Sequence, residues 1–280
     1  LLPAAGGAAL PALFGDNGSS SNPMRYAIRG ETAPGAGAAT FRSFLALGQN
    51  SSSAKYRATL AGSSSATNEG IWSPNVGLLL RKGEPFDPAN YPGIYARRIL
   101  RYWAVSPISS GDDQLIAWVV LGGTGVTSAN NQALLLRQQD GQFLILLRTG
   151  DPAPGIGIDS VKVARFLSVE VGLFGHYAVT GVLRGTASTR NVALWQGSSG
   201  LGDETTNRQL RLPGLVLQKG DTYSTSRTPR DVIRGLLLYP APDRTAAGLR
   251  GLSQSIGQFG HLAVGVIGDR RVTELVLLEP

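Results

Sequence analysis

The feature that most constrains the fold is a motif that returns four times along the chain. Each copy is a short apolar run followed by one or two polar residues, a glycine and a carboxylate. The copies occupy Tyr26–Glu31, Leu78–Glu84, Leu144–Asp151 and Leu215–Asp221. Their glycines are Gly30, Gly83, Gly150 and Gly220. A motif that recurs at this kind of interval indicates one supersecondary unit used repeatedly.

Three further elements recur between these copies. One contains Phe-Gly-His followed by Ala-Val and is found at Gly172–Val182 and Gly257–Val266. Another carries an aromatic residue or leucine, at Gly70–Trp72, Ala133–Leu136, Val192–Trp195 and Glu274–Leu278. The last follows the glycine turn, at Thr40–Leu45, Arg98–Trp103, Val163–Leu167 and Arg234–Leu238.

Each unit therefore holds four short runs of β-favouring residues separated by turns that contain glycine. Long runs with helical periodicity are hard to find, so we expect little helix. Four strands in each of about four units predict an all-β fold, specifically a β-propeller of about four four-stranded blades.

The two ends of the chain suggest how such a ring closes. The last unit reaches its third strand near Leu275 and then ends, whereas the chain begins with a lone fourth-type strand at Tyr26–Arg29. We expect this strand to complete the last blade, because an unpaired edge strand invites aggregation. Residues 24–280 would form the propeller, and residues 1–23 a flexible N-terminal arm or the remnant of a signal peptide.

Composition narrows the classes of partner. The 280 residues include 26 Lys and Arg against 19 Asp and Glu, which gives a net charge of +7. The arginines are spread along the chain with no basic run or helix, so nucleic acid is not expected as a partner. An arginine-biased surface suits acidic polysaccharide or an anionic cell surface. There is no cysteine, which excludes disulfides and a cysteine nucleophile. No apolar stretch is long enough to span a membrane as a helix.

One copy of the repeated motif, Arg148-Thr-Gly-Asp-Pro-Ala-Pro-Gly155, resembles an uncharacterised family of secreted bacterial repeat proteins. In that family a Gly-Asp-x-Ala-Pro-Gly turn alternates with Gly-x-Val-Ala-Phe-like and Gly-Ile-Trp-like strands. The resemblance covers about residues 26–279, and Ala33–Gly35 and Ala153–Gly155 keep the Ala-Pro-Gly segment. It implies a propeller-like fold and a secreted, extracellular or cell-surface bacterial location, and it implies no known activity. Such proteins often carry a C-terminal anchoring signal; the sequence as given shows none before Pro280, so anchoring is not expected.

Two sets of repeated polar residues are expected to be structural. His176 and His261 hold equivalent positions in the repeat, which favours a structural role over a catalytic one. The turn carboxylates, Glu31, Glu84, Asp151 and Asp221, are expected to accept backbone N–H groups and stabilise the turns. The alternative is a ring of carboxylates that binds cations on one face. No calcium-loop motif accompanies them, and no metal or cofactor is predicted.

The stretch most suited to a ligand is Tyr91–Trp103, the richest in arginine and aromatic residues. It follows the least regular insertion, Pro85–Pro92. The other tryptophans lie in repeated strands and are expected in the blade core. The predicted ligand-binding residues are Arg98, Arg101, Tyr102 and Trp103. The rings of Tyr102 and Trp103 could stack on sugars.

Two functions follow from these observations. The first is a non-enzymatic, exported binding or structural propeller, with protein or polysaccharide partners at the cell surface and a place as a subunit of a surface assembly or homo-oligomer. The second is a polysaccharide hydrolase or lyase with its site at the mouth of the ring channel. No nucleophile elbow, zinc-protease, P-loop or dinucleotide motif is present, so no catalytic residue is assigned and the first function is favoured.

Overall fold

The structure is a computed structural model that describes residues 2–3, 9–15, 24–49, 54–105, 114–172, 174–200, 210–224, 230–238, 255–257, 260–269 and 273–279. Within these residues the chain forms β-strands and one short 3₁₀ turn, Ser188–Arg190. None of them forms a helix long and apolar enough to cross a membrane. The all-β prediction is confirmed.

The chain forms two compact units. Unit 1 is Leu1–Gly125, Leu136–Leu144 and Thr245–Leu249. Unit 2 is Val126–Leu135, Ile145–Arg244 and Arg250–Pro280.

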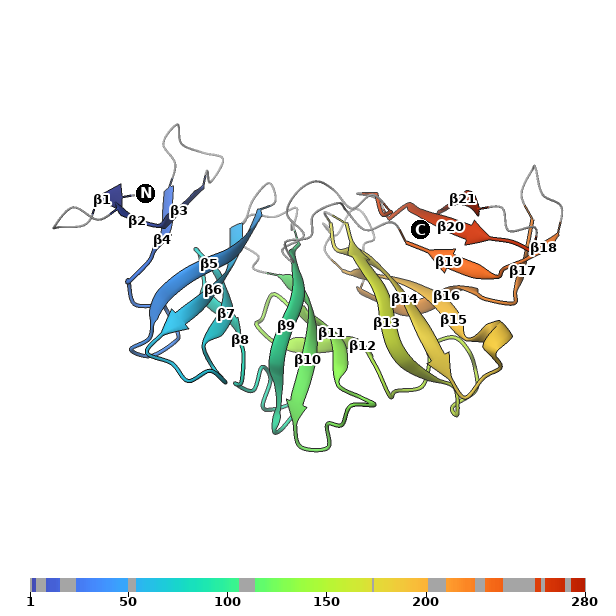
Figure 1. Ribbon diagram of the computed structural model, residues 1–280, viewed down its shortest axis with the longest axis horizontal. Helices are drawn as coiled ribbons and strands as arrows, with labels where there is room; N and C mark the ends of the chain where they lie inside the picture. The colour runs from blue at the N-terminus through green and yellow to red at the C-terminus, as the bar shows by residue number, and fades with distance from the viewer. Residues whose placement is uncertain are drawn as a thin grey trace. The chain divides into compact units, whose positions relative to one another are not determined.

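The first four-stranded sheet is an antiparallel meander in which each strand pairs with the next along the chain (Figure 1). Its strands are β5 (Thr40–Gln49), β6 (Ala54–Ala61), β7 (Glu69–Ser73) and β8 (Gly77–Arg81). Two short strands, β3 (Ala12–Gly15) and β4 (Met24–Ile28), pair with each other before it. A further short pair joins β1 (Leu2–Pro3) to β2 (Ala9–Leu10).

Two more four-stranded sheets repeat this order. One contains β9 (Ile94–Ala104), β10 (Leu115–Gly123), β11 (Gln132–Arg137) and β12 (Phe143–Arg148). The other contains β13 (Lys162–Val171), β14 (His176–Arg184), β15 (Val192–Ser199) and β16 (Leu210–Gln218). In each of them the first strand is an edge strand, as β5 is in its own sheet.

The last sheet has three strands among the described residues, in the order β19-β20-β21. They are β19 (Gly235–Leu237), β20 (Leu262–Ile267) and β21 (Thr273–Leu278), and a short pair, β17 (Thr222–Tyr223) and β18 (Asp231–Val232), precedes them. A four-strand unit that repeats along the chain was predicted, and the three complete sheets agree with it.

The same hydrogen bond joins one repeat to the next at all four motif glycines. Each glycine N–H donates to the carbonyl of a residue at the start of the following unit, at 2.8 Å. The four pairs are Gly30 to Phe41, Gly83 to Ala96, Gly150 to Val163 and Gly220 to Ile233. All four glycines have a positive φ, between 77° and 91°. This backbone conformation favours glycine and explains why the motif keeps it.

A tryptophan ties the Ala-Pro-Gly segment to the third strand of the same sheet. The indole Nε1 of Trp72 donates to the carbonyl of Pro34 at 2.9 Å, and that of Trp195 donates to Pro154 at 3.0 Å. The two units that keep Ala-Pro-Gly are therefore the two that carry tryptophan in this strand. The bond satisfies a buried polar group, since both indoles are fully buried.

Each unit has its own apolar core. In unit 1, Phe41, Tyr56 and Trp72 pack together with small residues of the repeated turn such as Ala33 and Ala39. In unit 2, β19 and β20 pack on the preceding sheet through Leu236, Leu262, Val264 and Val266 against Ala178 and Leu194.

Replacing Gly150 by alanine should destabilise the protein by about 2–4 kcal/mol. The residue has φ 89°, and a Cβ there would lie 2.6 Å from the Cβ of Asn130. Gly157 is the matched control, because its φ is 71° and no atom lies within 4 Å of its Cβ position. Gly157→Ala should cost only about 1 kcal/mol in urea unfolding, from the backbone alone. If both variants lost the same free energy of unfolding, the packing around Gly150 would not contribute to the stability of the junction.

Candidate functional site

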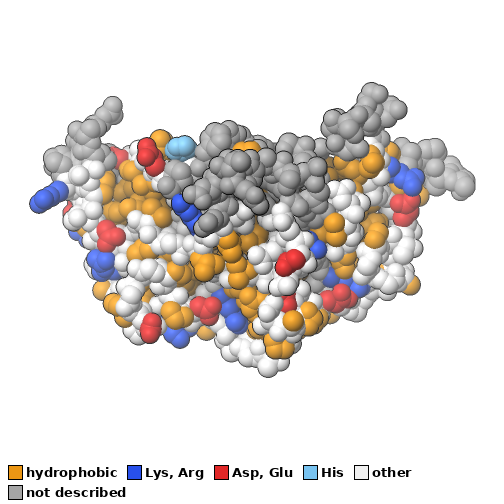
Figure 2. Space-filling model, turned by 180° about the vertical axis from the view of Figure 1, so that it is seen from behind, with side chains coloured by type: hydrophobic (Ala, Val, Ile, Leu, Met, Phe, Trp, Pro, Cys, Tyr) orange, Lys and Arg blue, Asp and Glu red, His pale blue; other side chains and the backbone are white. Residues whose placement is uncertain are grey.

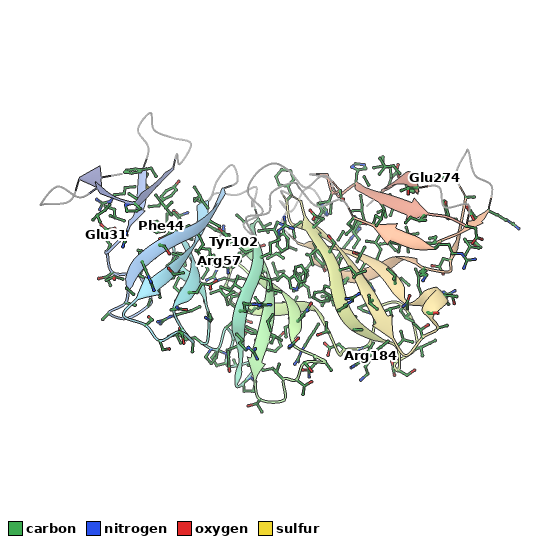
Figure 3. The ribbon with its side chains drawn as sticks, in the orientation of Figure 1. Glu31, Phe44, Arg57, Tyr102, Arg184 and Glu274 are labelled. Carbon is green, nitrogen blue, oxygen red and sulfur yellow. The ribbon has the colours of Figure 1, made fainter. Side chains whose placement is uncertain are left out.

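Tyr102 does not lie at a ligand-accessible surface. Its side chain is fully buried in unit 1, and its hydroxyl donates to the carbonyls of Lys55 at 3.1 Å and Ala46 at 3.2 Å (Figure 3). Burial raises the pKa of this phenol. Tyr102 thus joins β9 to the sheet formed by β5 and β6.

Trp103 is also buried, with 5% of its surface exposed, and the Arg101 guanidinium lies 5.2 Å from the centre of its ring. Neither aromatic ring offers a free face for stacking on a sugar. Of the four predicted ligand-binding residues, the structure therefore buries Tyr102 and Trp103, and only the exposed arginines of this stretch enter the candidate site.

The arginines lie on edge strands with a repeated irregularity. Each of the edge strands β5, β9 and β13 has two β-bulges, at matching positions relative to the neighbouring strand. The first bulge falls at Arg42, Arg97 and Ala164, and the second at Leu45, Leu100 and Leu167. Bulges bend an edge strand and spoil its pairing with other chains.

Arginine stands at the first bulge or directly after it in all three strands. The residues are Arg42, Arg97, Arg98 and Arg165, and all are exposed. No carboxylate within the described residues pairs with any of them. Elsewhere arginines do pair, in Arg25–Glu31, Arg57–Glu69, Arg81–Glu84, Arg190–Asp221 and Arg234–Asp269. The edge-strand guanidinium groups thus keep their donors available for an external anion, and guanidinium suits bidentate binding of carboxylate or sulfate.

Of these four, only Arg98 is among the residues predicted from the sequence to bind a ligand. Arg42 and Arg165 have no tyrosine or tryptophan close by in the sequence, and proximity to such residues does not predict them. The signal that could have found them is the arginine shared by the elements that follow each glycine turn, including Arg234 in the fourth unit.

The second bulge presents an exposed leucine. Leu45 is 46% exposed and Leu167 is 44% exposed, and Leu100 is partly exposed at the same position of β9. Leu237 of β19 is 40% exposed and follows the buried Leu236, as Leu167 follows the buried Phe166 and Leu45 follows the partly buried Phe44. Single exposed leucines are ordinary, but one that recurs at a matching position of each edge strand needs a reason.

The turn carboxylates lie at separate junctions. Glu31 accepts the backbone N–H of Ile28 at 3.0 Å, and Asp221 accepts that of Gln218 at 3.0 Å. Glu84 pairs with Arg81 at 2.6 Å. Partial desolvation raises the pKa of Asp151, and the nearby Arg148 and Lys162 oppose this shift. Within the described part of the chain, no three His, Asp or Glu side chains form a cluster that could hold a metal.

The two histidines sit in matching tight turns. The carbonyl of His176 accepts the N–H of Gly172 at 2.8 Å, and the carbonyl of His261 accepts that of Gly257 at 2.8 Å. The second turn packs on the first histidine, because a Cβ at Gly260 would lie 2.9 Å from His176 Nδ1.

The Pro85–Pro92 insertion is ordered by a buried carboxylate. Asp87 accepts the backbone N–H of Asn90 at 3.0 Å and its amide Nδ2–H at 2.9 Å, together with the N–H of Phe143 at 3.2 Å. Phe86 packs on Phe143 with 5.4 Å between ring centres. The Asn90 side-chain bond, followed by the backbone bonds, holds the pKa of Asp87 below its usual value against the effect of burial.

Comparison with known proteins assigns the chain to one family. A family model described as "Family of unknown function (DUF7453)" matches residues 11–203. The chain belongs to this family. Searches of curated proteins and of solved structures return no match to it.

Asp87→Ala should destabilise the protein by about 1–3 kcal/mol at pH 7, because two backbone N–H groups and an amide lose their acceptor. A depressed folded-state pKa gives stability that is present above the unfolded pKa and is lost as pH falls through the folded value. The difference in free energy of unfolding between the wild type and the variant should therefore shrink below about pH 4. Urea unfolding across pH measures it, with the exposed Asp159→Ala as control. A difference that stays constant down to pH 2 would contradict the assignment.

Proposed function

We propose that this protein is an exported, non-enzymatic β-propeller that binds acidic polysaccharide through the arginines of its edge strands. The observation that carries the proposal is the set of exposed arginines at matching positions of β5, β9 and β13 that have no carboxylate partner among the described residues. Export is inferred from the resemblance of the repeated motif to secreted bacterial repeat proteins.

The closing of the ring is the first part of the proposal. β21 is an edge strand of a sheet with three described strands, and its Leu275 and Leu277 are 70% and 66% exposed. β4, a fourth-type strand, is followed by the same glycine junction as the other fourth strands. We propose that β4 adds to β21, so that the edge is paired and the two leucines are covered. In the structure β4 pairs with β3.

The exposed leucines support the same arrangement. In a propeller the first strand of every blade lines the central axis. In the proposed ring, Leu45, Leu100, Leu167 and Leu237 would meet there and fill a narrow channel. This gives each of them a partner surface that its own sheet does not provide.

The arginines would then surround one end of that channel. Guanidinium groups at a regular spacing suit a polymer that carries a carboxylate or sulfate on successive sugars. The excess of arginine over lysine favours such planar, bidentate contacts, since 22 of the 26 basic residues are arginine. Figure 2 shows basic and acidic side chains interspersed over one face, so the net charge alone does not define a binding patch.

If the leucines fill the central channel, replacing one of them should destabilise the protein as much as replacing a buried leucine. Leu167→Asn should cost about 1.5–3 kcal/mol, the value of burying a leucine side chain. Ile158 is the control, because it is 57% exposed in a loop. Ile158→Asn should change stability by less than about 0.5 kcal/mol. If both variants unfold like the wild type in urea, the leucines do not meet at an axis.

The arginines predict a site-specific loss of binding. Arg98→Glu should weaken binding to polygalacturonate about tenfold at low salt, and wild-type binding should fall with ionic strength. Arg184→Glu is the matched control, with the same charge change at an exposed position on the second strand β14 (Figure 3). Surface plasmon resonance on immobilised polymer measures both. Equal weakening in the two variants would show a response to net charge alone and would overturn the site.

A further inference from the structure

A cavity of about 650 Å³ lies in unit 2, and its described lining includes none of the edge-strand arginines. Strands β14, β15 and β16 form its walls with Glu279, which follows β21. Its lining includes the polar residues His176, Gln196, Ser198, Arg211 and Glu279. This volume lies in the range of small-molecule sites.

An irregular strand pairing creates the hollow. Gln196 of β15 lies opposite Gly214 of β16, and Ser198 lies opposite Arg211. Two residues of β16, Leu212 and Pro213, therefore stand against one residue of β15. The extra residue bends β16, as bulges do next to binding sites.

Two glycines face this region for different reasons. Gly197 is required by packing, because a Cβ there would lie 2.2 Å from the Tyr177 hydroxyl. Gly214 has no such reason among the described residues: its φ is outside the left-handed region, and the nearest described atom to its Cβ position is the Gln196 carbonyl oxygen at 3.9 Å. Gly181, within β14, is also required by packing, since a Cβ there would lie 3.0 Å from the Trp195 ring.

Glycine inside a strand weakens that strand. At Gly214 neither backbone conformation nor packing requires this cost. What glycine does provide is space, because any side chain there would project into the cavity that Gly214 lines. The position is therefore suited to keeping the hollow open.

The charges of the cavity point to its ligand. Arg211 and Glu279 both line it, both residues are exposed, and no ion pair joins them to each other or to another described residue. The Gln196 amide is held in place by a bond from Nε2 to the Gly260 carbonyl at 2.6 Å. Leu212, Leu215 and Val216 supply an apolar wall. One cation, one anion and an apolar wall match a zwitterion with an apolar body.

We propose that this cavity binds a small zwitterionic ligand, an apolar amino acid or dipeptide. Its carboxylate pairs with Arg211, its ammonium group pairs with Glu279, and its side chain lies against Leu212 and Leu215. Every described residue that lines the cavity belongs to unit 2, and none of them is an exposed arginine of β5, β9 or β13.

The test is isothermal titration of the full chain with the dipeptide Leu-Leu. Arg211→Gln should weaken binding at least about tenfold, as loss of a charge-assisted contact does. The Tyr177 hydroxyl bonds to the backbone carbonyl of Arg211, so this variant keeps the fold contact. Gly214→Leu should remove binding by filling the hollow. Arg184→Gln, an equal charge change elsewhere, should stay within about twofold of wild type.

A second probe separates the two ends of the ligand. Leu-Leu amide, which lacks the carboxylate, should bind wild type as weakly as Leu-Leu binds Arg211→Gln. Arg98→Glu should bind Leu-Leu like the wild type, so failure here and failure of polysaccharide binding are distinguishable. No measurable heat with wild type, or unchanged affinity in Gly214→Leu, would overturn the proposal.

Discussion

The structure depends on one backbone hydrogen bond that is made four times, from a glycine N–H to a carbonyl at the start of the next unit. The chain leaves one strand with a positive φ at the glycine, and a connecting segment returns to the glycine at the start of the next unit. Glycine does this at little steric cost, whereas other residues pay for the left-handed conformation. Because each bond starts a new sheet, the spacing of these glycines in the sequence is the spacing of the sheets.

The other repeated contacts are arranged around this junction. The turn carboxylates at Glu31 and Asp221 accept N–H groups three residues before them, which closes the turn on its own strand. Where the turn continues as Ala-Pro-Gly, a tryptophan from the third strand holds the proline carbonyl. The paired bulges on the first strands follow, and they fix which side chains are turned outward. The exposed arginines and leucines are therefore consequences of the same repeat that builds the sheets.

Much of the fold could be predicted from the sequence because turns and strand lengths are local properties. The four motif glycines mark the junctions, and the four runs in each unit correspond to strands in three sheets. The surface could not be predicted in the same way. A bulge shifts the alternation of inward and outward side chains, so that Tyr102 is buried although Arg97 and Arg98 on the same strand are exposed. The role of Gly214 could not be predicted either, because the sequence does not distinguish a glycine that leaves space for a cavity from a glycine that forms a turn.

We propose that β4 completes the last sheet and closes the ring. The most direct measurement is hydrogen exchange of the backbone amides of β21 that do not bond to β20, in the full chain and in a chain that lacks residues 1–31. Closure predicts slow exchange of these amides in the full chain, comparable with the amides of β20, and fast exchange in the shortened chain. Fast exchange of the same amides in the full chain would contradict closure and leave an open array of sheets.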